Sequence, residues 1–197
     1  MADAGRDRDR FGRCRGRPAG AGLATTDNAV ATGWQGSVRN GTGLCGRDLR
    51  EVYKLNLGGR RIEIRHVGGA HTPGDSFVWL SGARTVFTGD IVYVGRILGV
   101  MEFSDSAAWL ESFAAIEALE PEHLVPGHGP ATTLEQAQAD TRDYLASLRA
   151  SMREHIDAGG DIIGSVDVDQ SAFRHLDQFE ALAGRNAQAV FQQMEWE

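Results

Sequence analysis

Alternation of apolar and polar residues begins at residue 52 and predicts a β-hairpin. Residues 53–57 read Tyr-Lys-Leu-Asn-Leu, the pattern of a strand with one buried face. Gly58-Gly59 suits a two-residue turn, because glycine adopts positive φ without steric penalty. Alternation resumes at Ile62, so we expect a return strand that extends to His66 and Val67.

Short apolar runs follow the hairpin and predict buried strands at residues 77–80, 85–87 and 123–125. Three helices are also expected, from their capping and stop signals or their apolar spacing. The first is capped by Ser104 or Asp105 and stopped by Pro121. The second is long, begins at a Thr133/Gln136 capping box and ends at Gly159-Gly160. The last runs from Asn186 to Trp196. Strands first and then mixed strands and helices predict a layered α+β domain over residues 51–197.

Residues 1–50 form a low-complexity segment that is rich in arginine and glycine. They carry nine arginines against five aspartates and show no helix or strand period. We interpret this segment as a disordered arm, because it offers little apolar surface to bury. Two alternatives stay open: a basic arm that contacts nucleic acid, and a non-native translation of G+C-rich DNA in the wrong frame.

Composition limits the classes of function. The net charge of −7 makes nucleic-acid binding by the whole chain unlikely on electrostatic grounds. No apolar run has the roughly 18 residues of a membrane-spanning helix, and no secretion signal is visible, so we expect no membrane partner and a cytoplasmic location by default. The two cysteines, Cys14 and Cys45, lie outside the predicted domain, so a metal site there would use other ligands.

Three glycine- and proline-rich turns each present a side chain that can bind a metal ion. They place His71 before Thr72-Pro73-Gly74, Asp90 after Gly89, and His128 between Gly127 and Gly129. Imidazole nitrogen and carboxylate oxygen are ligands of zinc and iron, and glycine allows the close backbone approach that a metal site needs. Each residue alone is more often an ordinary turn residue. The three together, with strands between them, predict a metal site.

Other polar residues have simpler interpretations. We expect His66 and His123 to pack within strands, and His155 and His175 to be surface residues without a partner. The series Arg142, Arg149 and Arg153 is expected to form a solvated helix face.

The three turns read Gly69-Ala70-His71-Thr72-Pro73-Gly74-Asp75, Phe87-Thr88-Gly89-Asp90 and Pro126-Gly127-His128-Gly129. With the strands around them, they resemble the C-terminal half of a metallo-β-lactamase-superfamily (MBL-fold) metallo-hydrolase. The run from Gly89 to Arg96 and the tripeptide Gly184-Arg185-Asn186 further resemble the zinc hydrolases of quinoprotein relay systems.

The resemblance implies part of an αββα sandwich with one or two zinc ions at the sheet edge. By resemblance, His71 is a ligand of the first metal, Asp90 bridges both metals, and His128 is a ligand of the second. It also implies hydrolysis of a small-molecule ester, thioester or lactam by a metal-activated hydroxide, without a separate catalytic side chain or organic cofactor.

The family's first ligand motif, H-x-H-x-D-H, is missing from this sequence. All six histidines follow residue 65, and the β-layer that would carry the motif is not encoded either. We therefore expect an incomplete site and an uncovered apolar sheet face. Whether the chain is an enzyme stays open. The alternative is a non-catalytic fragment or interaction module of this fold, including a homodimer formed through that face.

Overall fold

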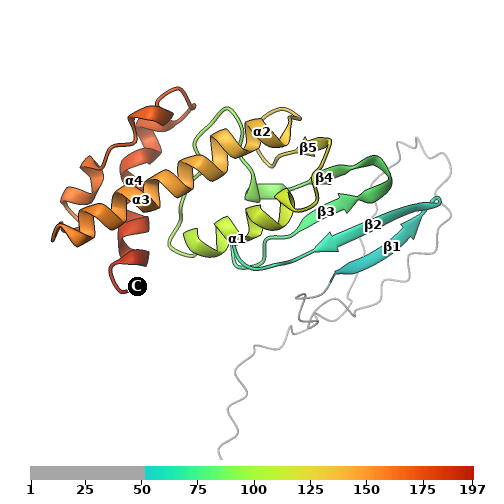
Figure 1. The fold of residues 1–197 in the computed structure, drawn as a ribbon, viewed down its shortest axis with the longest axis horizontal. Helices are drawn as coiled ribbons and strands as arrows, with labels where there is room; N and C mark the ends of the chain where they lie inside the picture. Colours follow the sequence, from blue (N-terminus) through green and yellow to red (C-terminus); the bar gives the residue numbers. More distant parts are fainter. Residues whose placement is uncertain (1–51) are drawn as a thin grey trace, which may run out of the picture. The chain divides into compact units, whose positions relative to one another are not determined.

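The computed structural model describes residues 52–197, and the predictions made for residues 1–50 lie outside this part of the chain. A five-stranded sheet has the order β1-β2-β3-β4-β5 (Figure 1). Neighbouring strands are antiparallel from β1 to β4, and β5 runs parallel to β4. The strands are β1 Tyr53–Leu57, β2 Arg60–Arg65, β3 Phe77–Leu80, β4 Thr85–Phe87 and β5 His123–Val125. All five were predicted, although β2 ends at Arg65 and not at Val67.

The helices follow the predicted order with three differences. They are α1 Ser106–Glu117, α2 Leu134–Ala137, a π-helical segment Gln138–Arg142, α3 Asp143–Asp157 and α4 Phe179–Met194. The helix α1 stops at Glu117, four residues before Pro121, and Glu120, directly before the proline, has φ +47°, outside the helical region. The long helix was expected to be continuous, but the π-helical segment separates α2 from α3. The last helix begins seven residues earlier than Asn186, where the apolar stripe of its first turns was not recognised.

Side-chain caps start two of these helices as expected. The Asp105 carboxylate accepts hydrogen bonds from the backbone N–H groups of Ala107 and Ala108, at 3.0 and 2.9 Å. The Thr133 hydroxyl accepts from the Gln136 N–H at 3.3 Å. The Gln136 side-chain amide donates to Asp140, and its oxygen does not accept from the Thr133 N–H, so only half of the predicted capping box forms.

The hydrophobic core lies between one face of the sheet and the helices. Phe77, Trp79, Val86 and Leu124 alternate along β3, β4 and β5 and are at most 6% exposed. Helix α1 contributes a second buried layer that includes Trp109, and α3 and α4 add the rest of one continuous cluster. Figure 1 shows β1 at the sheet edge that lies farthest from α3 and α4.

The opposite face of the sheet is apolar but exposed. The paired residues Tyr53, Ile64, Val78 and Phe87 point to this face, because residues directly opposite each other in neighbouring strands share a side of the sheet. Tyr53 is 40% exposed, Phe87 41% and Leu57 51%. We call this surface the open face.

The arginines of the long helix form specific ion pairs, which corrects the prediction of a solvated face. Arg142 binds Glu117 of α1 at 2.6 Å. Arg149 donates to the Ser106 hydroxyl at the start of α1 and pairs with Glu197, which also pairs with Arg153. The helix α3 is therefore fixed to α1 and to the residue that ends the chain.

His155 is also more than the predicted surface residue. Its Nε2 lies 2.8 Å from the Asp161 carbonyl oxygen, and its ring packs edge-on against Phe191 of α4. His66 follows β2, and its Nδ1 lies 2.7 Å from the Asp75 carbonyl oxygen.

Between residues 52 and 197, no helix is both long and apolar enough to cross a membrane.

Candidate functional site

Two of the three predicted turns are joined by backbone hydrogen bonds beside β4 and β5. The Gly127 N–H lies 2.9 Å from the Gly89 carbonyl oxygen and 3.1 Å from that of Val92. The Val94 N–H donates to the His128 carbonyl at 2.9 Å. These bonds continue the parallel pairing of the two strands, so the loops that carry Asp90 and His128 are held against each other.

Asp90 and His128 consequently face each other. The His128 Nε2 lies 3.5 Å from the Asp90 Oδ1, and their side chains are 39% and 40% exposed. A carboxylate and an imidazole at this distance can both bind one water molecule or one cation. We therefore take this pair as the candidate functional centre of residues 52–197.

The glycines beside His128 are required by close packing. A Cβ atom at Gly127 would collide with the Asp90 carboxylate and would lie 2.6 Å from the Gly89 carbonyl oxygen. Gly129 has φ +102° and lies directly against the Val94 carbonyl. The two glycines thus set the short separation between the loops, as the sequence predicted for a site that needs close backbone approach.

His71 lies in a separate loop with its own supports. Its Nδ1 is 3.1 Å from the Gly99 carbonyl oxygen, which can only accept, so Nδ1 carries the proton and Nε2 is left available. The Asp75 carboxylate closes the loop by accepting from the Thr72 N–H and hydroxyl at 2.9 and 2.7 Å. The Trp109 ring packs edge-on against the imidazole, with ring centres 5.8 Å apart.

Tyr93 connects the two parts of the site, and the sequence analysis did not select it. Its ring stacks on His128 with centres 4.6 Å apart, and its centre lies 6.2 Å from that of His71. Burial raises the pKa of the Tyr93 phenol, and the Asp90 carboxylate raises it further. The phenol therefore stays protonated at neutral pH. In the sequence, the sign of this role is that an aromatic residue stands three positions after Asp90.

The π-helical segment holds the loop of Tyr93 in place. The Thr141 hydroxyl donates to the Tyr93 carbonyl at 2.6 Å and accepts from its N–H at 2.9 Å. The Asp140 carboxylate accepts from the Gly95 N–H at 2.8 Å. Such π-helical turns frequently occur beside functional sites. Here the turn places the side chains of Asp140 and Thr141 against the loop that carries Tyr93.

Helix α4 supports the loop of His71 through the connector formed by residues 98–106. Asn186 is 1% exposed, accepts from the Val100 N–H at 2.9 Å and donates to the Leu98 carbonyl at 2.7 Å. Gln193 bonds the Ser106 N–H and the Ser104 carbonyl, both at 2.9 Å. The Ser104 hydroxyl in turn donates to the His71 carbonyl at 2.7 Å.

The residues between 52 and 197 do not complete a metal centre. A protein-bound zinc ion takes at least three protein ligands, and this part of the chain contains no group of three or more His, Cys, Asp or Glu side chains arranged to hold a metal. Asp90 and His128 come together, and the structure does not group His71 with them. The assignment of all three as ligands of one centre stays a prediction.

Comparison with known proteins identifies a family resemblance over half of the chain. A sequence model described as the metallo-beta-lactamase superfamily matches residues 30–128. A sec-alkylsulfatase, Pisa1 from Pseudomonas sp., has 18% identity and a TM-score of 0.56 over 73% of this chain and 25% of its own. A metallo-beta-lactamase from Pontibacter korlensis has 23% identity and a TM-score of 0.45 over 49% of this chain and 46% of its own.

These similarities have defined limits. The likeness to the sulfatase concerns the fold alone, since the identity is low. The chain spans less than half the length of either structure. No curated protein matches the sequence.

Proposed function

This chain belongs to the metallo-beta-lactamase superfamily, and on that premise we propose that it carries the second half of a metal-dependent hydrolase site. The proposed substrates are small molecules of the ester, thioester or lactam class, and zinc is the proposed metal. The observation that carries the proposal is the Asp90–His128 pair, partly exposed and 3.5 Å apart, on loops at adjacent strand ends.

The chain's own residues have definable roles in such a site. The His128 Nε2 and the Asp90 carboxylate would hold the zinc ion, which would supply an activated water for attack on the substrate carbonyl. The protonated phenol of Tyr93 fixes the imidazole plane by stacking on it. His71 presents a free Nε2, because its Nδ1–H donates to the Gly99 carbonyl oxygen.

The pair alone does not fit a complete zinc site, so we expect weak metal binding by this polypeptide. Further imidazole ligands would have to come from another polypeptide or a longer form of this protein, because residues 1–65 contain no histidine. Zinc binding in this proposal is measurable but weaker than at a site with three or four protein ligands.

Zinc titration of the full chain against a chromophoric chelator tests this proposal. We expect saturable weak binding that is lost in Asp90→Asn and in His128→Gln, together with slow zinc-dependent cleavage of an activated ester or thioester. His175→Gln is the matched control, because His175 is exposed and bonds only the Ala172 carbonyl among residues 52–197. Equal zinc binding by wild type and both site variants would contradict the proposal, as would a lack of zinc-dependent hydrolysis.

The open face favours a second candidate, an interaction module without catalysis. Its apolar side chains include Tyr53, Leu57 and Phe87, each at least 40% exposed. A second copy of this chain could cover them and form a homodimer. Light scattering with size-exclusion chromatography and binding of a hydrophobic dye test this candidate. A compact monomer that does not bind the dye would exclude it.

A further inference from the structure

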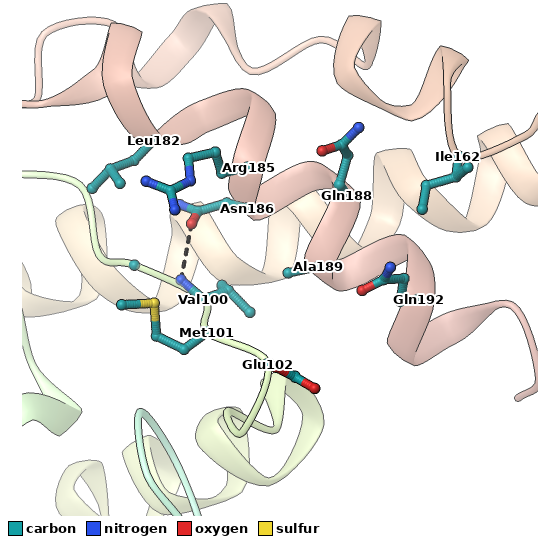
Figure 2. A pocket seen from close by; sticks show the side chains of 11 residues that line it. Val100, Met101, Glu102, Ile162, Leu182, Arg185, Asn186, Gln188, Ala189 and Gln192 are labelled. Atoms are coloured by element: carbon teal, nitrogen blue, oxygen red, sulfur yellow. Dashed lines mark hydrogen bonds between the residues drawn. The ribbon is translucent and has the colours of Figure 1, made fainter.

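A cavity of about 320 Å³ lies between helix α4 and the connector of residues 98–106, next to the His71 loop. Figure 2 shows Arg185 and Gln188 on the helix, with Val100 and Met101 on the connector. The Gly99 backbone forms part of the cavity wall, and its carbonyl oxygen accepts from His71. The cavity and the candidate site therefore share one short segment of backbone.

Arg185 gives the cavity a positive charge that no residue between 52 and 197 pairs with. Arg185 is exposed and lines the cavity, and its guanidinium forms no ion pair or side-chain hydrogen bond with any residue from 52 to 197. The arginines at positions 142, 149 and 153, by contrast, are all paired with carboxylates. A free guanidinium presents two parallel N–H groups that match a carboxylate.

Apolar side chains form part of the rest of the wall, beside the polar Asn186, Gln188 and Gln192. Met101 is 45% exposed, and Val100, Ile162, Leu182 and Ala189 also line the cavity. Phe103, two residues beyond Met101, is 55% exposed, and its ring centre lies 6.0 Å from that of His71. Exposed apolar side chains beside a hollow are typical of a ligand-binding surface.

Glu102 limits the charge of the ligand. Its carboxylate lies in the cavity wall on the far side of Val100 and Met101 from Arg185 (Figure 2). A second anionic group on the ligand would be repelled there. The wall thus fits a molecule with one acidic group and an uncharged, apolar body.

We propose that this cavity binds a small organic acid, with its carboxylate on Arg185 and its apolar body against Met101 and Leu182. The buried Asn186 keeps the wall in position, because it bonds both Leu98 and Val100 (Figure 2). Binding here places the ligand beside Gly99 and hence beside His71. The binding itself is independent of the proposed hydrolase function. Only its interpretation as a subsite for an acidic substrate rests on that function.

Titration of the full chain with hexanoate, followed by NMR of backbone amides and without added metal, tests the proposal. We expect saturable shifts at Gly99–Glu102 and along α4. Arg185→Gln should weaken hexanoate binding about tenfold, as expected for the loss of a charged hydrogen-bond pair. Arg174→Gln is the matched control, because Arg174 lines a different cavity and should leave the affinity unchanged.

Two ligand controls separate the charge from the apolar contact. Hexanamide keeps the shape of hexanoate and removes its charge, so it should bind about as weakly as hexanoate binds to Arg185→Gln. Acetate keeps the charge and loses most of the apolar body, so it should also bind more weakly. Equal affinities for hexanoate and hexanamide, equal affinities for hexanoate and acetate, or an unchanged affinity in Arg185→Gln would each overturn the proposal.

Zinc-dependent hydrolysis distinguishes this proposal from the function proposed above. If the chain binds hexanoate through Arg185 but does not hydrolyse esters, the binding site is supported and its role as a substrate subsite is excluded. If the chain hydrolyses esters but hexanoate causes no NMR shift at Gly99–Glu102, the hydrolase function is supported and binding in this cavity is excluded.

Discussion

The two faces of strands β3 and β4 have similar sequences and opposite environments. Phe77 and Trp79 point to the face that is covered by helices and are at most 6% exposed. Val78 and Phe87 point to the open face, where Phe87 is 41% exposed. Both faces of these two strands are apolar, so hydrophobicity alone does not decide which is buried. The helices that follow β4 and β5 cover one face and, through the same contacts, fix the loops of the candidate site.

The largest expected effect comes from a matched pair of phenylalanines on adjacent strands. Phe77→Ala should lower the free energy of unfolding by about 3–5 kcal/mol, because it removes a fully buried ring and leaves a cavity. Phe87→Ala should cost less than about 1 kcal/mol in the monomer. Urea denaturation of both variants measures the difference. A large loss in Phe87→Ala that depends on protein concentration would show that a second copy covers the open face.

A pair of glycines compares the site loops with an exposed turn. Gly127→Ala should cost about 1–3 kcal/mol and separate His128 from Asp90, because the new Cβ collides with the Asp90 carboxylate. Gly82→Ala should change stability little, since nothing lies within 4 Å of a Cβ built there. Urea denaturation and NMR of the His128 ring report the two effects. Similar stability of the two variants would contradict the close packing described for the site.

The polar support of the connector can be tested on helix α4. Asn186→Ala should cost about 1–3 kcal/mol, because it leaves the Val100 N–H and the Leu98 carbonyl without their partner. Gln188→Ala, an exposed change on the same helix, should have an effect below about 0.5 kcal/mol. Thermal unfolding measures both. If Asn186→Ala is as stable as Gln188→Ala, other contacts hold the connector.

The smallest expected effect concerns the acid range and compares two carboxylates. A hydrogen bond from Arg65 lowers the pKa of Glu63, which is 5% exposed on the covered side of β2, and the charges of Arg65 and Arg61 lower it further. A lowered pKa stabilises the fold above the ordinary glutamate value, and this contribution disappears as the pH falls through the folded value. Glu63→Gln should therefore lower stability at neutral pH and flatten the dependence of stability on pH below about 4.5.

Glu122 provides the control for that measurement. It pairs with Arg84 at 3.0 Å, but its side chain is 63% exposed, and exposed pairs contribute little to stability. Glu122→Gln should leave the pH profile almost unchanged. Profiles of the two variants that coincide would show that burial does not strengthen the Glu63 pair.

Much of the architecture could be predicted from local pattern. Alternation predicted the first two strands and short apolar runs predicted the other three, and the Asp105 and Thr133 caps placed the starts of two helices. The family resemblance, confirmed by the match to residues 30–128, rested on the same short turns. These signals are local, because strand alternation, turn residues and caps depend on neighbours in the sequence.

Long-range contacts could not be predicted in this way. No local pattern pairs Arg149 with Glu197, places Tyr93 on His128, or interrupts the long helix at residues 138–142. Each depends on which segments meet after folding. The isolated appearance of His155 was misleading for the same reason, since its partner is a backbone carbonyl that no sequence pattern identifies.

The sequence by itself determined the strands, the turns and the chemical types of the candidate ligands, because these follow from local periodicity and from the geometry of glycine and proline. Only the tertiary structure decided how those side chains are grouped. It brought Asp90 to His128 through the parallel pairing of β4 and β5, and it tied His71 to Gly99 through the connector that α4 supports. Distances between side chains depend on packing across the whole core, and no local pattern contains them.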